Sequence, residues 1–357
     1  MLLIVYTTGQ CNLRCRYCGG SFPPNVVPWR IEYPVKLLVD FVSRVDNPII
    51  CFYGGEPLLN PRFIEKVMDE IEDAKYVIQT NGLLVDALRR EYWARFDTVL
   101  LSIDGREEVT DYYRGRGVYR AVLRAAHKLR EYGFKGDLVA RMVVSEKSDV
   151  FKEVYHLYSL KVFDHIHWQL DVVWSDRWKD FDKWVRESYK PGLEKLVNWW
   201  INMVKGGTVP GIAPFQALTY SMLTGKNLPS PPCESGVNSF TILPDGRIIA
   251  CPIAIYEKWA EVGQLGVNSP KTVKRVEIDE PCISCPYFKL CGGRCLYAYK
   301  ERLWGEEGFR KICNLTIYLI NLLKQRLNEV REALNNGLIE LEDLNYPKYN
   351  NSVEIIP

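Results

Sequence analysis

The sequence predicts an α/β fold whose first half forms a parallel sheet, and two observations carry this prediction. From residue 2 to about 173, apolar β-rich runs alternate with amphipathic helical stretches, and six such repeats can be counted. Pro34, Pro57 and Pro61 stand where helices would begin, a position at which the missing N–H of proline costs nothing. Six parallel units are too few to close an eight-stranded barrel, so we expect a partial barrel or a doubly wound sheet.

The expected strands and helices alternate along this half of the chain. The strands are expected at 2–7, 48–53, 76–80, 98–103, 137–144 and 165–173. The helices are expected at 33–44, 61–74, 84–95, 117–133 and 148–160. In either type of sheet, the loops at the carboxyl ends of the strands carry the chemistry.

The second half of the chain changes character. A helical, aromatic-rich connection is followed by a hairpin with Pro244-Asp-Gly246 at its turn, and then by a cysteine-rich segment that ends at Cys313. An amphipathic helix is expected over 314–335, where Asn335-Asn336-Gly337 forms a plausible C-cap. We therefore divide the chain into domains at 1–175, 176–230, 231–314 and 315–357, the last being a helix and a tail.

Composition excludes several classes of function. The 46 Lys and Arg residues against 44 Asp and Glu give a net charge of +2, so the total charge predicts no binding of nucleic acid or of an anionic membrane. The longest apolar run, 315–323, is far shorter than the roughly 20 residues of a membrane-spanning helix. No export signal is recognised, so we expect a cytoplasmic protein. In that reducing compartment, eleven cysteines favour metal ligation over disulfides.

Three cysteines stand directly after the first expected strand. The segment Cys11-Asn-Leu-Arg-Cys15-Arg-Tyr-Cys18 can point three thiols at one metal centre. Three thiolates on a four-iron cluster leave one iron open to a chelating ligand. The alternative is a zinc knuckle, although zinc sites usually take four protein ligands.

This loop resembles the radical S-adenosylmethionine (SAM) superfamily, whose hallmark is Cys-x3-Cys-x2-Cys after the first strand. The resemblance implies that SAM chelates the open iron, and that one electron from the reduced cluster cleaves SAM to a 5′-deoxyadenosyl radical that abstracts a substrate hydrogen. It also implies that Tyr17, just before the third cysteine, lies against the adenine.

Further segments match the family strand by strand. Tyr53-Gly-Gly-Glu-Pro57 matches the Gly-Gly-Glu-Pro motif, and Gln79-Thr-Asn-Gly82 and Leu101-Ser-Ile-Asp-Gly105 match later segments. The resemblance therefore implies a set of SAM-binding residues, with Glu56 at the ammonium, Ser102 at the ribose and Arg141 at the carboxylate. The full set is Tyr17, Gly54, Gly55, Glu56, Asn81, Ser102, Arg141 and Gln169. Cys51 fits no ligand pattern and is expected in the core.

Seven further cysteines occupy the C-terminal part of the chain. Considered alone, their CxxC and Cx3C pairs would fit two structural zinc sites, although seven ligands leave one of two tetrahedral sites short. Their spacing resembles the SPASM extension of radical SAM enzymes, which holds two auxiliary iron–sulfur clusters. By that resemblance one auxiliary cluster is held by Cys282, Cys285, Cys291 and Cys313, and the other by Cys233, Cys251 and Cys295.

Together these resemblances imply a partial (β/α)6 TIM-like barrel, followed by a small cysteine-rich SPASM domain and a C-terminal helix. The implied cofactors are SAM and three [4Fe-4S] clusters. The implied partners are a peptide or protein whose side chain is oxidatively modified, and a low-potential electron donor such as ferredoxin or flavodoxin. The opening through Phe22 also resembles an archaeal group of radical SAM proteins assigned to peptide modification.

Two alternative functions stay open. The same chemistry could mature a redox cofactor or a partner metalloenzyme, or the chain could be a zinc-stabilised binding module without turnover. The sulfatase maturases of this family have an additional cysteine in the hairpin and an acidic residue where Pro252 stands here, so formylglycine formation is not expected.

Overall fold

A computed structural model of the chain describes residues 1–172, 178–302 and 304–346. The start of the predicted connection and the predicted tail over 347–357 lie outside these residues. The chain divides into two compact units that interleave along the sequence. The first comprises Met1–Ile103, Thr110–Val139 and Glu234–Glu277, and the second comprises Asp104–Val109, Ala140–Cys233 and Ile278–Pro357. The domain boundaries expected from the sequence stay predictions.

The first unit is built on a mainly parallel sheet with the strand order β4-β3-β2-β1-β7-β8-β9. Its strands are β1 (Leu2–Thr8), β2 (Ile49–Gly54), β3 (Lys75–Thr80), β4 (Thr98–Ser102), β7 (Ser239–Ile242), β8 (Arg247–Ile249) and β9 (Glu261–Gln264). Strand β1 pairs in parallel with β2 on one side and with β7 on the other. All seven residues of β1 are buried, as expected for a parallel strand that is covered on both faces.

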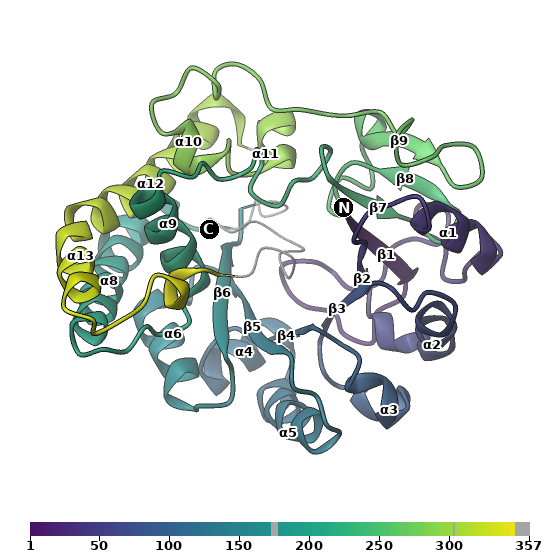
Figure 1. Cartoon of the computed structure of the whole chain (residues 1–357), viewed down its shortest axis with the longest axis horizontal. Helices are drawn as coiled ribbons and strands as arrows, with labels where there is room; N and C mark the ends of the chain where they lie inside the picture. The colour runs from purple at the N-terminus through teal and green to yellow at the C-terminus, as the bar shows by residue number, and fades with distance from the viewer. Residues whose placement is uncertain (173–177, 303, 347–357) are drawn as a thin grey trace. The chain divides into compact units, whose positions relative to one another are not determined.

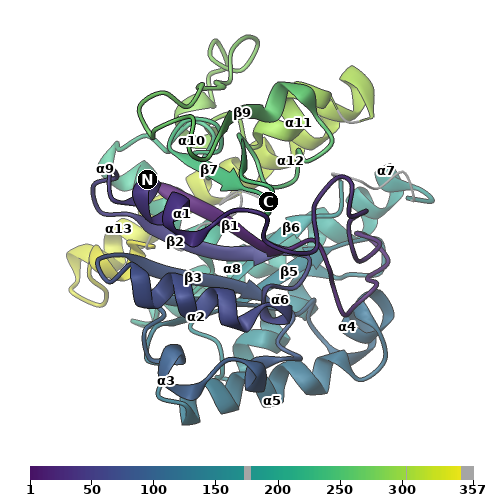
Figure 2. The same ribbon diagram turned by 90° about the vertical axis from the view of Figure 1, so that its right-hand side faces the viewer.

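Helices cover this sheet on its outer side. Figure 1 shows the helices α1, α2 and α3 on the outer side of strands β1 to β3, and in Figure 2 helix α2 runs alongside β3 with α3 below it. The helices are α1 (Val35–Val42), α2 (Pro61–Glu70), α3 (Arg90–Trp93), α4 (Glu107–Arg114) and α5 (Val118–Glu131), of which α4 begins in the second unit. Because each helix returns the chain to the same edge of the sheet, the segments that follow β1, β2, β3 and β4 meet at the carboxyl ends of these strands.

The second unit contains most of β5 (Asp137–Val144), with β6 (His165–Leu170) beside it, and a set of packed helices. The helices are α6 (Val150–Ser159), α7 (Phe181–Trp184), α8 (Lys190–Lys205), α9 (Ala213–Thr224), α10 (Phe288–Cys291), α11 (Leu296–Glu301), α12 (Gly305–Gln325) and α13 (Leu327–Asn335). A π-helical turn, Val185–Tyr189, joins α7 to α8. Helices α8, α9, α12 and α13 lie side by side (Figure 1).

The structure corrects three details of the expected elements. The helix expected over 84–95 is interrupted, because extended backbone at Leu88 buries that side chain. Helix α4 was not expected, since its buried face combines Val109 and Tyr113 with the polar residues Thr110 and Arg114 and so gives no clear apolar pattern. The helix expected over 314–335 begins at Gly305 and is divided at Arg326, so Cys313 lies inside α12.

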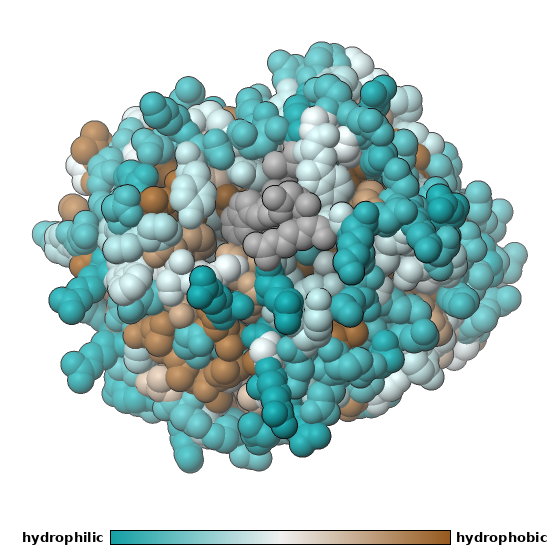
Figure 3. All heavy atoms as spheres, turned by 180° about the vertical axis from the view of Figure 1, so that it is seen from behind, coloured by the Kyte–Doolittle hydropathy of each residue, from teal (hydrophilic) through white to brown (hydrophobic). Residues whose placement is uncertain are grey.

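Within the described ranges, no helix is both long and apolar enough to cross a bilayer. The face turned away from the viewer in Figure 1 is largely hydrophilic, and the largest group of hydrophobic residues on it forms a patch at the lower left of Figure 3.

Candidate functional site

The three N-terminal cysteines lie in a tight loop after β1. The N–H of Cys11 donates to Ser21 Oγ at 2.9 Å, and the N–H of Gly19 donates to the carbonyl of Cys15, also at 2.9 Å. Cys15 is buried, whereas Cys18 is exposed. Burial raises the pKa of Cys11 to about 11, the Leu13 N–H opposes this, and the charges of Glu56 and Cys18 add to it. The loop therefore places a partly buried thiol close to the motif that follows β2.

Gly54, the last residue of β2, and Gly55 allow the chain to pass very close to the backbone that leads into the cysteine loop. A Cβ at Gly55 would lie 2.1 Å from the carbonyl oxygen of Gln10, and a Cβ at Gly54 would lie 2.3 Å from that of Thr8. The N–H groups of Gly55 and Glu56 donate to the same two carbonyls, at 3.0 and 2.7 Å respectively. Because glycine has no Cβ, the backbone that leads into Cys11 can lie directly against these two residues.

Glu56 is buried at the centre of this region. One oxygen of its carboxylate, Oε1, accepts hydrogen bonds from Thr80 Oγ1 at 2.6 Å and from the N–H of Leu58 at 3.1 Å. The other, Oε2, accepts from the N–H of Asn81 at 2.8 Å. Burial raises the pKa of Glu56 to about 7, and these hydrogen bonds oppose the shift. A cationic ligand beside Glu56 would favour its charged form.

Asn81 connects the end of β3 with the cysteine loop. Its Nδ2 donates to Asn12 Oδ1 at 2.7 Å, and its Oδ1 accepts from the N–H of Leu83 at 3.1 Å. Thr80, beside it, donates to Glu56 and accepts from the N–H of Gly82. The segments after β1, β2 and β3 are therefore joined by side-chain hydrogen bonds.

Tyr17 lies in an aromatic and cationic group. Its ring centroid is 5.8 Å from that of Tyr113, and the Arg114 guanidinium lies 5.4 Å from the Tyr17 ring centroid. Arg16 donates from Nε to the carbonyl of Tyr112 at 2.7 Å. These contacts hold the cysteine loop against the end of α4 and fix the Tyr17 ring, which fits the expected adenine contact.

The remaining predicted SAM residues lie at or near strand ends in both units. Ser102 is the last residue of β4 and is buried. Arg141, on β5, is buried, and its Nη1 lies 2.9 Å from His167 Nδ1. Because arginine only donates, His167 accepts at Nδ1 and carries its proton at Nε2. Gln169 lies on β6 and is half-buried.

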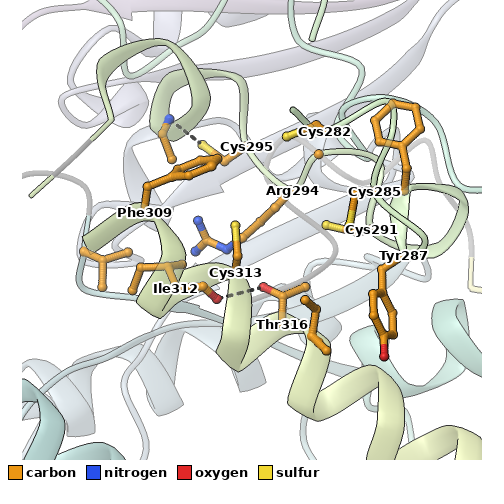
Figure 4. A pocket seen from close by; sticks show the side chains of 15 residues that line it. Cys282, Cys285, Tyr287, Cys291, Arg294, Cys295, Phe309, Ile312, Cys313 and Thr316 are labelled. Carbon is orange, nitrogen blue, oxygen red and sulfur yellow. Dashed lines mark hydrogen bonds between the residues drawn. The ribbon is translucent and has the colours of Figure 1, made fainter. Parts of the chain in front are cut away.

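A cavity in the second unit gathers the C-terminal cysteines (Figure 4). Cys282, Cys285, Cys291 and Cys313 line it together with Cys295 and Arg294. The other lining residues are mostly apolar and, apart from Val172 after β6, come from α10, α11, α12 and the segments beside them: Val172, Tyr287, Phe288, Gly293, Ala298, Phe309, Ile312, Thr316 and Ile317. Four of these five cysteines are the set that the sequence predicts for one auxiliary cluster.

The residues around this cavity fit an anionic, sulfur-bound group. Burial raises the pKa of Cys291 to about 12, and the charge of Cys313 raises it further, whereas Arg294 lowers it. Burial also raises the pKa of Cys282 to about 11, again with a contribution from Cys313. Thiols with such pKa values become thiolates only when a metal takes the proton's place.

A single metal ion fits less well. Within the described part of the chain, no three His, Cys, Asp and Glu side chains form a group that could hold one ion. Four thiolates on one tetrahedral zinc must converge at about 2.3 Å from it, whereas a cluster binds each thiolate through a different iron. The donor set of the cavity, four thiols from separate segments, suits a cluster of this kind.

The second predicted ligand set draws on both units. Cys295 is the N-cap of α11, where its Sγ accepts from the N–H of Ala298, and Cys233 lies in the same unit. Cys251 belongs to the first unit and is buried after β8. Assignment of Cys233, Cys251 and Cys295 to one cluster stays a prediction. Cys51 is completely buried in β2, which confirms its expected place in the core.

Two residues of the first site were not identified from the sequence. Asn12 lies between Cys11 and Cys15, where the spacing of the cysteines says nothing about the residues between them. Thr80 lies within the matched segment before Asn81, but only its hydrogen bond to buried Glu56 distinguishes it from an ordinary strand residue.

The fold and the first site define an iron–sulfur enzyme that binds SAM at the carboxyl ends of parallel strands. Residues 5–154 match the model of the radical SAM superfamily. This segment of the chain is therefore similar to the radical SAM domain, and the spacing of the C-terminal cysteines matches that of the SPASM extension.

Two curated relatives match most of the chain. It is 26% identical over 331 residues to the cysteine-type anaerobic sulfatase-maturating enzyme of Clostridium perfringens (strain 13 / Type A), a match that covers 82% of this chain and 88% of that one. It is 26% identical over 316 residues to the mycofactocin maturase MftC of Mycolicibacterium smegmatis, covering 82% of this chain and 76% of that one.

Solved structures share the fold. The structure of native anSMEcpe with bound AdoMet and Cp18Cys peptide has a TM-score of 0.70 at 21% identity, covering 94% of this chain and 99% of that one. Streptococcus suis SuiB bound to its precursor peptide SuiA has a TM-score of 0.57 at 17% identity, covering 85% and 73%. The expected fold class, a partial (β/α)6 barrel with a cysteine-rich C-terminal region, is confirmed.

Proposed function

We propose that this chain binds one [4Fe-4S] cluster through Cys11, Cys15 and Cys18, binds SAM beside it, and oxidatively modifies a side chain of a peptide or protein. The observation that supports the proposal most strongly is the hydrogen-bonded connection from Asn12 through Asn81 to Glu56. It joins the cysteine loop to the two motifs expected to hold SAM. A cluster bound by the loop and a ligand bound by the motifs would therefore be held in a fixed relation.

The residues of this site would take distinct roles. Glu56 would hold the SAM ammonium, because a buried carboxylate with a raised pKa is stabilised by a cation. Tyr17 would pack against the adenine, and Ser102 would bind the ribose. Arg141 would bind the carboxylate, with His167 fixing the direction of its guanidinium. When cluster and SAM are bound, they supply a 5′-deoxyadenosyl radical that abstracts a hydrogen atom from the substrate.

Several findings support a peptide or protein substrate. Two relatives that match 82% of the chain are maturases, and both of the similar solved structures contain a bound peptide. Formylglycine formation is not proposed. Pro252 stands where the sulfatase maturases of this family have an acidic residue, and its carbonyl accepts a hydrogen bond from Tyr6 at 2.7 Å. Maturation of a redox cofactor or of a partner metalloenzyme would use the same chemistry.

The electron donor and the compartment belong to the same proposal. Reduction of a SAM-binding cluster needs a low-potential donor, for which ferredoxin or flavodoxin would serve. Ten of the eleven cysteines are assigned to metal ligation, which suits a reducing cytoplasm.

Anaerobic reconstitution with iron and sulfide tests the proposal. We expect about twelve irons per chain, since ten of the cysteines fall into three cluster sets, and we expect 5′-deoxyadenosine from SAM once a low-potential reductant is added. The chain with Cys11, Cys15 and Cys18 all replaced by alanine should keep about eight irons and form no 5′-deoxyadenosine. Protein that contains zinc but no acid-labile sulfide would instead indicate a zinc-stabilised binding module without turnover.

The substrate class needs its own measurement. Peptide libraries incubated with enzyme, SAM and reductant should yield products lighter by about two mass units for each hydrogen pair removed. The same assay with the triple-alanine chain is the control. SAM cleavage without a change in any peptide or protein partner would favour maturation of a small redox cofactor.

A further inference from the structure

An arginine of the β7–β8 hairpin contacts the segment that follows the cysteine loop. Arg247 is the first residue of β8, and its Nη2 donates to the carbonyl of Val26 at 2.5 Å, across 221 positions of sequence. Its other two guanidinium nitrogens bind carboxylates, since Nε donates to Asp245 at 2.7 Å and Nη1 donates to Glu261 at 3.0 Å. Because two carboxylates fix the plane of the guanidinium, its third nitrogen is directed at Val26.

The contacted segment, residues 22–32, is irregular backbone with three prolines that have no N–H to donate. The N–H of Gly9 donates to the carbonyl of Pro28 at 3.0 Å, and the carbonyl of Gly9 accepts the N–H of Phe22 at 2.9 Å. Gly9 stands two residues before Cys11, the first of the expected cluster ligands. The segment is therefore bound to the backbone that leads into the cysteine loop.

Three further hydrogen bonds fix the segment. Thr8 Oγ1 donates to the carbonyl of Trp29 at 2.9 Å, and Trp29 Nε1 donates to the carbonyl of Phe22 at 2.8 Å. On the other side, the N–H of Glu32 donates to the carbonyl of Pro244, in the hairpin turn, at 2.8 Å. The segment thus lies between the hairpin and the base of the cysteine loop, and it is hydrogen-bonded to both.

We propose that Arg247 is a positioning residue of the SAM-binding site. It holds segment 22–32, and through this segment it keeps the cysteine loop in the orientation in which a cluster on the three N-terminal cysteines can take SAM. The inference rests on the proposed function, because it needs a cluster that binds SAM. Arg247 acts through the segment and not by contact with the cofactor.

The surroundings of Arg247 make its contact with Val26 a strong one. The side chains of Arg247 and Asp245 are 28% and 23% exposed, so their charges are partly shielded from water. A hydrogen bond from a cationic donor is stronger than one between neutral groups. Its loss should change the equilibrium between the held and the released segment by roughly tenfold or more.

Hydrogen exchange of the metal-free, full-length chain tests the positioning step without any cofactor. We expect Arg247→Gln to exchange the amides of 9–22 about tenfold faster, and to leave the amides of β2 and β3 unchanged. Glu261→Gln is the matched control. It removes one carboxylate from the same guanidinium but keeps the donor to Val26, so only the amides of β8 and β9 should respond. Unchanged exchange over 9–22 in Arg247→Gln would overturn the proposal.

A second measurement uses the reconstituted chain. Arg247→Gln should keep about twelve irons, because no cysteine is removed, and should bind SAM roughly tenfold more weakly. The readout is the SAM concentration that half-completes the change in the electron paramagnetic resonance spectrum of the reduced cluster. Glu261→Gln should bind SAM like the unmodified chain. Full iron content with unchanged SAM affinity in Arg247→Gln would confine Arg247 to the fold of the hairpin and overturn the proposal.

Failure of the variant and failure of the proposed function are distinguishable. If Arg247→Gln does not fold, Arg247→Lys takes its place, because lysine keeps the charge between the carboxylates but has one nitrogen where arginine has three. The same faster exchange over 9–22 is then expected, and unchanged exchange overturns the proposal. A chain that binds no SAM with Arg247 in place would refute the proposed function, and the exchange result would show separately whether Arg247 holds the loop.

Discussion

The side-chain amide of Asn81 donates to the side-chain oxygen of Asn12 at 2.7 Å, although the two residues are 69 positions apart in the sequence. Asn12 lies inside the cysteine loop, and the N–H of Asn81 donates to buried Glu56. Through these two hydrogen bonds, Asn81 connects the cysteine loop to the motif that contains Glu56. The orientation of the loop should therefore depend on residues that bind no metal.

Replacing Asn12 by alanine tests this dependence. Asn81 Nδ2 would lose its acceptor, and this loss costs about 1–2 kcal/mol in free energy. If the loss destabilises the SAM-bound state, the affinity for SAM falls roughly five- to thirtyfold. Iron content should not change, because no thiol is removed. Equilibrium binding of SAM to the reconstituted enzyme measures the effect, with the exposed Asn202→Ala as the control. Unchanged affinity would show that the contact does not position the loop.

Gly55→Ala should damage the same site more severely. The new methyl group would lie 2.1 Å from the carbonyl oxygen of Gln10, so one backbone must move. We expect a loss of several kcal/mol in unfolding free energy and a chain that retains only its auxiliary iron. Gly206→Ala is the matched control, because a Cβ at Gly206 would lie 3.3 Å from the nearest atom, the carbonyl oxygen of Met203. Iron analysis and urea denaturation distinguish the two variants, and equal behaviour would contradict the packing argument.

Glu56 should make the stability of the metal-free protein depend on pH. Its pKa is raised from 4.5 to about 7 in the folded chain. Between these values the folded chain holds more protons than the unfolded one, so the stabilising contribution of Glu56 is complete at lower pH and is lost as pH rises through 7. Glu56→Gln cannot titrate. The urea midpoint of the parent should therefore fall, relative to that of the variant, from pH 4.5 to pH 7, and parallel curves would exclude a raised pKa.

Cys51→Ala should behave as a core substitution. Cys51 is completely buried in β2, and loss of its sulfur should cost about 1 kcal/mol in unfolding free energy. Iron content and formation of 5′-deoxyadenosine should equal those of the unmodified enzyme. Any loss of about four irons would identify Cys51 as a ligand after all.

The sheet could be predicted from the sequence because its strands are short apolar runs separated by amphipathic helices. Strand β1, buried along its whole length, is the clearest case. Helix α4 could not be predicted in the same way, since two of its buried residues, Thr110 and Arg114, are polar and half of its sequence is charged. Strand β9 was missed because its four residues, Glu261–Gln264, have no periodic pattern and depend on pairing with β8.

The metal-binding motifs could be recognised by cysteine spacing, which is a local property of the sequence. The contacts that orient them are not local, because the partners of Glu56 and Asn12 come from other strands. Arg294 illustrates the same limit. Its sequence neighbours, glycine and cysteine, give no sign that its charge is buried, and only the fold of 288–313 around the cavity shows it.

The position of Cys313 inside α12 has a consequence for how the protein acquires iron. Helix α12 packs against α8 and α9 through contacts that need no metal, so this thiol has a fixed place before any iron arrives. Cys282 and Cys285, by contrast, stand in a turn held by single backbone hydrogen bonds. Binding of the metal would then order the segment with Cys282 and Cys285 against helix α12, which is already formed. In the metal-free chain, the amides of 279–291 should exchange with solvent faster than those of α12.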